Sequence, residues 1–122
     1  MGEFMTLQEI APIIELDLGR KDALFGGRED MYVKFLRKFP DNVNKLLIDL
    51  ETAVGTKNNV AIEAAAHGIK GVASNLGIGE VTRLGTALML DIRENTPENI
   101  EEHYSKLVEE TRKAIKYIGL LD

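Results

Sequence analysis

The sequence predicts an all-α fold, an antiparallel four-helix bundle with a short extra helix at the N-terminus. Three observations lead to this prediction. Apolar residues recur at spacings of three and four, and no stretch alternates apolar and polar residues over the length of a strand. Capping residues, prolines and glycines divide the chain into four long helical segments. The connections between these segments are short, so neighbouring helices should pack antiparallel.

The N-terminal part is predicted to contain a short helix followed by a loop. Thr6 and Glu9 have the spacing of a capping box, which predicts the start of the short helix. Residues 18–27 are rich in glycine, and this composition is typical of a loop.

A long helical segment comes next, and a proline divides it. Residues 28–38 have a helical pattern that places Met31, Phe35 and Phe39 on one side. Pro40 should kink or restart the helix, because it has no N–H to donate and its ring clashes with the preceding turn. The apolar stripe then continues to a terminating glycine.

Capping residues place the three remaining helices. The first begins near Asn58 or Asn59, both good caps, and runs to about Asn75 before a glycine stop. The second covers residues 80–93. The third opens with Thr-Pro-Glu and spans residues 96–118, because proline and acids favour the first turn of a helix.

The composition limits the possible functions. The chain has 122 residues, the size of one domain, and a formal net charge of -5. Nucleic-acid binding needs a surplus of Lys and Arg, so this class is not expected. Cysteine is absent, which excludes disulfides and thiolate catalysis. No apolar run approaches the roughly 18 residues of a membrane span, and no secretory signal is visible. We therefore expect a cytoplasmic protein without a membrane partner.

Residues 1–5 are interpreted as an expression scar and a native start at Met5, and residues 6–122 as a single domain. Residues 1–6 also satisfy the loose pattern for N-myristoylation, with Thr6 in the required place. We favour the scar because this pattern is short and often met by chance. We expect a monomer, since the predicted bundle leaves no spare apolar face.

The predicted helix over residues 59–76 has one buried side and presents a histidine on the other. At about 100° per residue, its apolar side chains cluster on one face. These side chains are Ile62, Ala65, Ile69, Val72 and Leu76. His67 points almost directly away from that face. The outward strip around His67 also contains Glu63, Lys70, Gly71 and Ser74.

An outward imidazole beside a lysine is suited to carrying a phosphoryl group. The ordinary imidazole pKa of about 6.5 leaves much of the nucleophilic neutral form at cytoplasmic pH. Lys70 lies one turn after His67, where its ammonium can reach an attached group and partly neutralise a new negative charge. Gly68 and Gly71 each cost about 1 kcal/mol in a helix interior relative to alanine. We interpret both glycines as keeping the surface bare for a bulky partner.

Residues 66–77, with the sequence AHGIKGVASNLG, resemble the signature of histidine-containing phosphotransfer (HPt) domains. That signature is a histidine, Lys-Gly at the third and fourth following positions, small residues, and a hydrophobic residue before glycine. Residues 26–39 resemble the first long helix of the family, and residues 84–88 resemble a later one. Gly68 stands where the family often has a hydroxyl or a longer side chain, and Met89 where an acid commonly follows leucine.

The resemblance implies a phosphocarrier in a two-component multistep phosphorelay. His67 would exchange a phosphoryl group with receiver-domain aspartates through its Nε2 atom, Lys70 would steady that group, and Gly71 would leave room for the receiver. The implied partners are a response-regulator receiver domain, a hybrid histidine kinase, or both. Docking is expected on the surrounding side chains Glu63, Ala64, Gly68, Ser74 and Asn75.

The same resemblance implies a carrier and substrate of phosphotransfer, and not an enzyme. The chain would need no cofactor of its own, because the receiver holds the magnesium and most of the catalytic groups. No Gly-rich nucleotide loop is present, so a self-contained kinase is not expected.

Two other interpretations of these residues are a metal site and a helical adaptor. Glu63 and His67 have the i, i+4 spacing of two metal ligands, but zinc generally needs three or four, and only His103 remains as a second histidine. We therefore expect no metal site. A non-catalytic helical adaptor with a degenerate phosphorelay site is the alternative function, and the presence of His67, Lys70 and Gly71 together argues against it.

A basic cluster lies within this acidic chain. It consists of Arg28, Lys34, Arg37 and Lys38. These side chains are predicted to be solvated, and as a hypothesis some of them help to hold the acidic pocket of a receiver.

Overall fold

The computed structural model describes residues 3–122, and residues 1 and 2 of the expected expression scar lie outside this range. The prediction of an all-α bundle is confirmed for the described residues. Three short helices come first: α1 (Leu7–Ile10), α2 (Gly19–Phe25) and α3 (Glu29–Leu36). Four long helices follow: α4 (Phe39–Gly55), α5 (Asn59–Leu76), α6 (Gly79–Arg93) and α7 (Pro97–Ile118).

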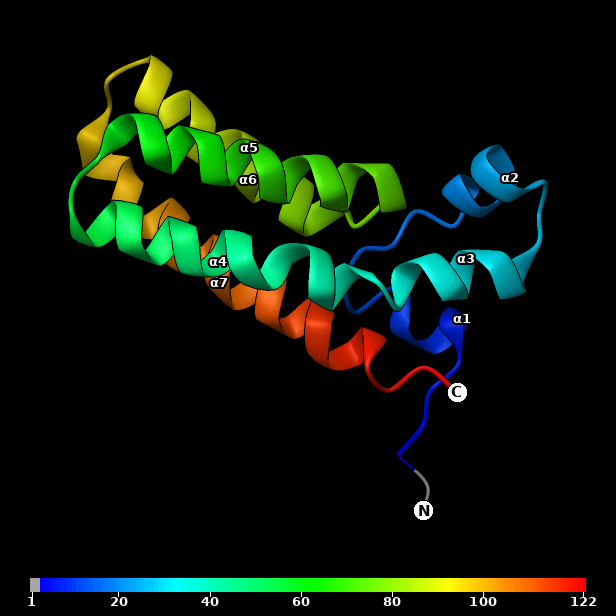
Figure 1. Ribbon diagram of the computed structural model, residues 1–122. Helices are drawn as coiled ribbons and strands as arrows, with labels where there is room; N and C mark the ends of the chain where they lie inside the picture. The colour runs from blue at the N-terminus through cyan, green and yellow to red at the C-terminus, as the bar shows by residue number, and fades with distance from the viewer. Residues whose placement is uncertain (1–2) are drawn as a thin grey trace.

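The four long helices form the bundle, each running antiparallel to the next (Figure 1). Helix α5 packs against α4 on one side and α6 on the other, and α6 packs against α7. Large side chains of all four helices are fully buried in the common core, among them Phe39, Leu50, Ile69, Leu88 and Leu107. None of the helices in residues 3–122 contains a segment long and apolar enough to cross a membrane.

The N-terminal part differs from the sequence prediction, because residues predicted to form a loop contain helix α2. Just before this helix, the carboxylate of Asp17 accepts a hydrogen bond of 2.9 Å from the N–H of Gly19, the first residue of α2. Gly26 ends it in the left-handed conformation, with a φ of 60°. No residue of α2 is buried, so the helix lacks the apolar periodicity by which sequence analysis detects helices.

Helix α3 and the start of α4 support one end of the bundle. Pro40 lies in the first turn of α4 and separates the two helices, which confirms that the proline restarts the helix. Tyr32 and Leu36 form the buried side of α3. Phe35, predicted to lie on the same side as Phe39, is instead 38% exposed, and its ring packs against that of Phe25 with centroids 5.0 Å apart.

The C-terminal end of α5 is held by the N-terminal segment. Gly77 ends the helix with a φ of 81°, and its carbonyl accepts a 2.7 Å hydrogen bond from the Asp17 N–H. The Gly79 N–H donates to the Glu15 carbonyl at 2.9 Å. The buried Tyr32 hydroxyl donates to the Leu76 carbonyl at 2.5 Å. These bonds join α3 and the segment before α2 to the turn between α5 and α6.

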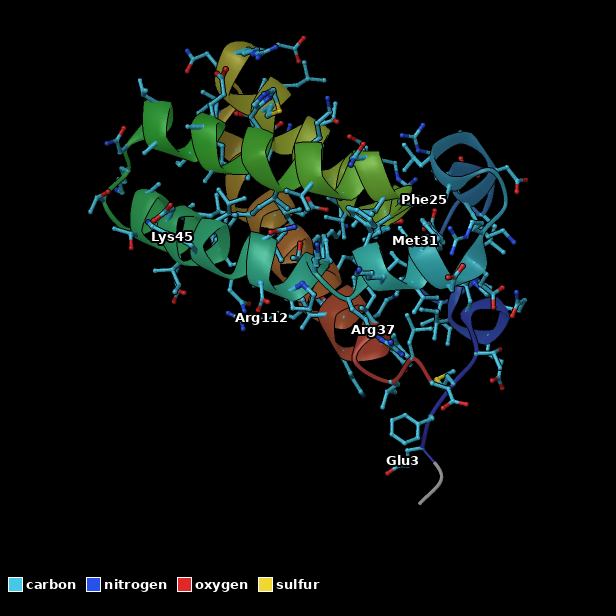
Figure 2. All side chains as sticks on the ribbon, turned by 45° about the vertical axis from the view of Figure 1, so that its right-hand side comes forward. Glu3, Phe25, Met31, Arg37, Lys45 and Arg112 are labelled. Carbon is cyan, nitrogen blue, oxygen red and sulfur yellow. The ribbon has the colours of Figure 1, made fainter. Side chains whose placement is uncertain are left out.

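The two ends of the described chain are joined. The Met5 N–H donates to the Leu120 carbonyl at 2.8 Å, and the Asp122 N–H donates to the Met5 carbonyl at 3.1 Å. Arg37 extends from the α3–α4 junction toward the C-terminal segment (Figure 2) and donates to the Leu121 carbonyl at 3.2 Å. The N-terminal helices are thereby tied to α7.

Replacing Tyr32 with phenylalanine should lower the free energy of unfolding by about 1–2 kcal/mol at neutral pH, because the Leu76 carbonyl loses its buried partner. Burial, with a smaller contribution from Asp17, raises the pKa of the Tyr32 hydroxyl above its ordinary value of 10.0. Above that pH the unfolded chain releases the proton while the folded chain keeps it, so the wild type loses stability that the variant retains. Urea titrations should show the difference shrinking above about pH 10; a constant difference would contradict this account.

Candidate functional site

Helix α5 buries three sides and leaves one open. Ile62, Ala65, Ile69 and Leu76 are buried as predicted, and Val72 is half-buried. Ala66 and Ala73 are also buried, although neither belongs to the predicted stripe. The buried arc is wider than expected because α4 and α6 contact α5 from both flanks.

His67 lies at the middle of the open side and is exposed, as its position on the helix predicted. No residue of the described chain hydrogen-bonds to its ring; the hydrogen-bonded histidine is His103. Lys70, one turn further along, is half-buried. Within residues 3–122, no carboxylate forms an ion pair with its ammonium group.

The two glycines that flank His67 have different surroundings. A Cβ atom added at Gly71 would meet nothing within 4 Å, and this residue is exposed. A Cβ atom at Gly68 would come 2.9 Å from Cδ2 of Leu46 on α4. Gly71 thus leaves open surface beside the imidazole. Gly68, by contrast, makes room for Leu46, which corrects the interpretation that both glycines keep the surface bare.

An ion pair borders the imidazole on the α6 flank. Glu63 lies one turn before His67, and its Oε2 atom accepts a 3.0 Å hydrogen bond from Nε of Arg93 on α6. Val60, Glu63, Ala64, His67 and Arg93 line one shallow hollow. Arg93 was not among the residues predicted for the site. Its pairing with Glu63 could have been expected, because the two residues are equally distant in sequence from Ile78, in the turn that joins antiparallel α5 and α6.

Two further hollows lie along the α4 flank of α5. One is formed by α4 and α5, with Leu46, Asp49, Ala61 and Ala64 among its lining residues. The other lies where α3 and α4 meet α5 and is lined by Phe35, Asn42, Gly71, Val72, Asn75 and Leu76. The imidazole therefore stands on a ridge with concave surface on either side.

The remaining residues predicted for docking lie near the C-terminal end of α5. The half-buried Ser74 donates from its hydroxyl to the Gly71 carbonyl at 3.3 Å. Asn75 is exposed, and its backbone carbonyl accepts bonds from Nε and Nη2 of Arg20 at 3.3 and 3.2 Å. Of the five residues predicted for docking, Ala64 and Asn75 are exposed, whereas Glu63, Gly68 and Ser74 are half-buried.

The basic cluster does not converge on the imidazole. Arg28 pairs with Asp30 at 2.9 Å, and Arg37 binds the C-terminal segment. The Nζ atom of Lys38 lies 4.9 Å from the centroid of the Phe35 ring, and Phe35 lines the hollow beside Gly71.

The second histidine has a different environment. His103 is half-buried, as its boundary position predicted. Its Nδ1 atom lies 2.5 Å from Oδ2 of the buried Asp91, and this contact joins α7 to the end of α6. In the described part of the chain, no three His, Asp or Glu side chains are grouped so that they could hold a metal ion.

Comparison with known proteins gives one positive result. A family model described as the Hpt domain matches residues 34–116, which include helices α4, α5 and α6 and most of α7. Comparisons with curated proteins and with solved structures return no match. The matched segment covers more than half of the chain and contains the exposed histidine with its neighbouring lysine and glycine. The chain therefore belongs to the Hpt domain family.

Proposed function

We propose that this chain is a phosphocarrier in a multistep phosphorelay and that His67 is the residue that carries the phosphoryl group. Membership of the Hpt family implies a phosphotransfer role, because Hpt domains are phosphoryl carriers rather than catalysts. The observation that supports His67 is its exposed imidazole, which has no hydrogen-bond partner in residues 3–122, on the one open side of α5. His103 is the other candidate, but it is half-buried and bonded to Asp91.

The proposed reaction is a reversible exchange between a nitrogen and an oxygen. The unprotonated ring nitrogen of His67, Nε2 in our proposal, attacks the phosphorus of a receiver aspartyl phosphate in line with the leaving oxygen. The N–P bond forms as the P–O bond breaks, and the aspartate is released as a carboxylate. The reverse reaction passes the phosphoryl group to a second receiver. This chain supplies the nucleophile and a docking surface, and the receiver supplies its magnesium and catalytic groups.

Lys70 and Gly71 are proposed to assist in different ways. The Lys70 ammonium forms no ion pair within residues 3–122, so it is available to bind the phosphoryl oxygens one turn from its own position. Gly71 has open space where a side chain would stand, which suits the close approach of a partner domain. The surroundings of Lys70 and Gly71 and the family motif support both assignments.

Receiver docking is proposed to cover Glu63, Ala64, Gly68, Ser74 and Asn75 together with the flanking hollows. The hollows on either side of the ridge offer concave, partly apolar surface to the partner. Lys38 above the Phe35 ring adds a positive charge at the edge of the hollow beside Gly71. A cation there complements the acidic phosphorylation pocket of a receiver.

Incubation with receiver domains phosphorylated by radiolabelled acetyl phosphate tests the phosphoacceptor. The wild-type chain should acquire an acid-labile, base-stable label, and His67→Gln should abolish it while leaving the fold intact, because His67 is exposed. The matched control His103→Gln should retain the label. Label on another residue, or none with any receiver of a broad panel, would favour the helical adaptor.

Lys70→Ala should slow transfer to His67, or shorten the lifetime of the phosphohistidine, by about tenfold, because a charge-assisted hydrogen bond to the phosphoryl oxygens is lost. Lys106→Ala is a suitable control, since Lys106 is also on a bundle helix but pairs with Glu102 on α7. Rapid-quench kinetics and the decay of the isolated phosphoprotein measure the two quantities. If Lys70→Ala matches the wild type in both, the lysine has no such role.

Gly71→Leu should reduce the rate of transfer by about a hundredfold or more, because the new side chain occupies the space needed by the docked receiver. Ser105→Leu provides the control, because Ser105 is exposed on α7, which contributes no residue to the three hollows. Thermal unfolding should show that both variants fold. A fully active Gly71→Leu protein would reject the docking account.

A further inference from the structure

At Gly85, helix α6 lies close against the backbone of α5. A Cβ atom added there would lie 2.8 Å from Cβ of Lys70, 3.3 Å from Cα of Lys70 and 3.3 Å from the carbonyl oxygen of Ala66. Gly85 itself is buried. The missing side chain therefore lets α6 lie directly against α5 at the residues on either side of His67.

This contact differs from the one at Gly68. The neighbour of Gly68 is the end of the flexible Leu46 side chain, which can turn away. The neighbours of Gly85 are main-chain atoms and a Cβ, whose positions are set by the α5 helix itself. A larger residue at position 85 would therefore have to move the two helices apart, because no side chain can relieve the overlap.

The contact limits the conformations of the Lys70 side chain. A freely rotating lysine side chain loses about 2 kcal/mol of rotamer entropy when it is immobilised, and this loss weakens its binding to a phosphoryl group. The Lys70 stem begins against the backbone of α6, so that side of its rotamer space is blocked. The rotamers that do not enter α6 remain open to this half-buried side chain, and His67 is exposed one turn before it on the same helix.

We propose that Gly85 is a positioning residue for phosphotransfer, which acts by holding the Lys70 stem against α6 so that its ammonium is already oriented toward a phosphoryl group on His67. The inference rests on the proposed function. In this proposal the backbone of α6 contributes to the site by positioning Lys70, and Gly85 itself does not contact the reacting atoms. It also explains why a buried position in the middle of α6 contains glycine, which costs about 1 kcal/mol relative to alanine.

Gly85→Ala tests the proposal in a double-mutant cycle with Lys70→Ala, measured by transfer from the same labelled receivers. The single variant should slow transfer, or shorten the phosphohistidine lifetime, by about threefold to tenfold, because a displacement of less than an ångström misplaces the ammonium. In the Lys70→Ala background the same change should have no further effect. Equal losses with and without Lys70 would overturn the proposal, because Gly85 would then act only on helix packing.

Gly68→Ala is the matched control, since it adds the same methyl group on the opposite flank of α5. Any loss that it causes should be equal in the presence and absence of Lys70. The wild type must first show label on His67, and absence of that label refutes the proposed function itself. Label on the wild type combined with unchanged kinetics in a folded Gly85→Ala protein refutes only the present inference.

If Gly85→Ala does not fold, the wild-type protein supplies the decisive measurement. Carbon relaxation by NMR should show a restricted stem for Lys70 and a mobile one for the exposed Lys106, and contacts between Gly85 Hα and the Lys70 Hβ protons should be observed. A Lys70 stem as mobile as that of Lys106 would overturn the proposal.

Discussion

The close packing of α4 and α6 against the two flanks of α5 is the constraint on which the rest of the structure depends. A helix with neighbours on both flanks and the core beneath it has only one side left for solvent. Small residues bring the neighbours near: Gly68 accepts Leu46 from α4, and Gly85 accepts the α5 backbone at Lys70. Because both flanks are closed, the imidazole of His67 lies on the side of α5 that stays exposed.

The N-terminal segment contacts one end of the bundle and stabilises the C-terminal end of α5. The bonds from Asp17 and Tyr32 to the last residues of α5 fix where the helix stops. Helix termini otherwise fray, since their last carbonyls have no partners within the helix. Gly71 and Asn75 lie in the final two turns, so this support keeps the surface beside His67 in a defined shape.

A phosphocarrier of this kind needs little chemical machinery of its own. The groups near His67 are an ammonium that forms no ion pair within residues 3–122, one ion pair between Glu63 and Arg93, and open surface at Gly71. In the proposed function these groups bind and release a phosphoryl group, and the receiver would supply the acids and metal that activate phosphorus.

The sequence by itself determined the helical character of the bundle, the limits of α5, and the position of His67 opposite the buried stripe. These features follow from local periodicity and from caps such as Asn58 and Gly77, which act over a few residues. Helix α2 was not predicted, because none of its side chains is buried and its sequence therefore has no apolar stripe. The approximate limits of α6 and α7 were likewise foreseen from their apolar spacing and from Pro97.

Only the tertiary structure decided which neighbours each residue of the site would have. The same residue type stands at positions 68, 71 and 85, yet one accepts a leucine, one faces solvent and one meets a helix backbone. The pairing of Arg93 with Glu63 and the exposure of Phe35 beside Gly71 were decided in the same way. Local sequence specifies the direction in which a side chain leaves its helix, whereas the distance and angle between helices set what lies there.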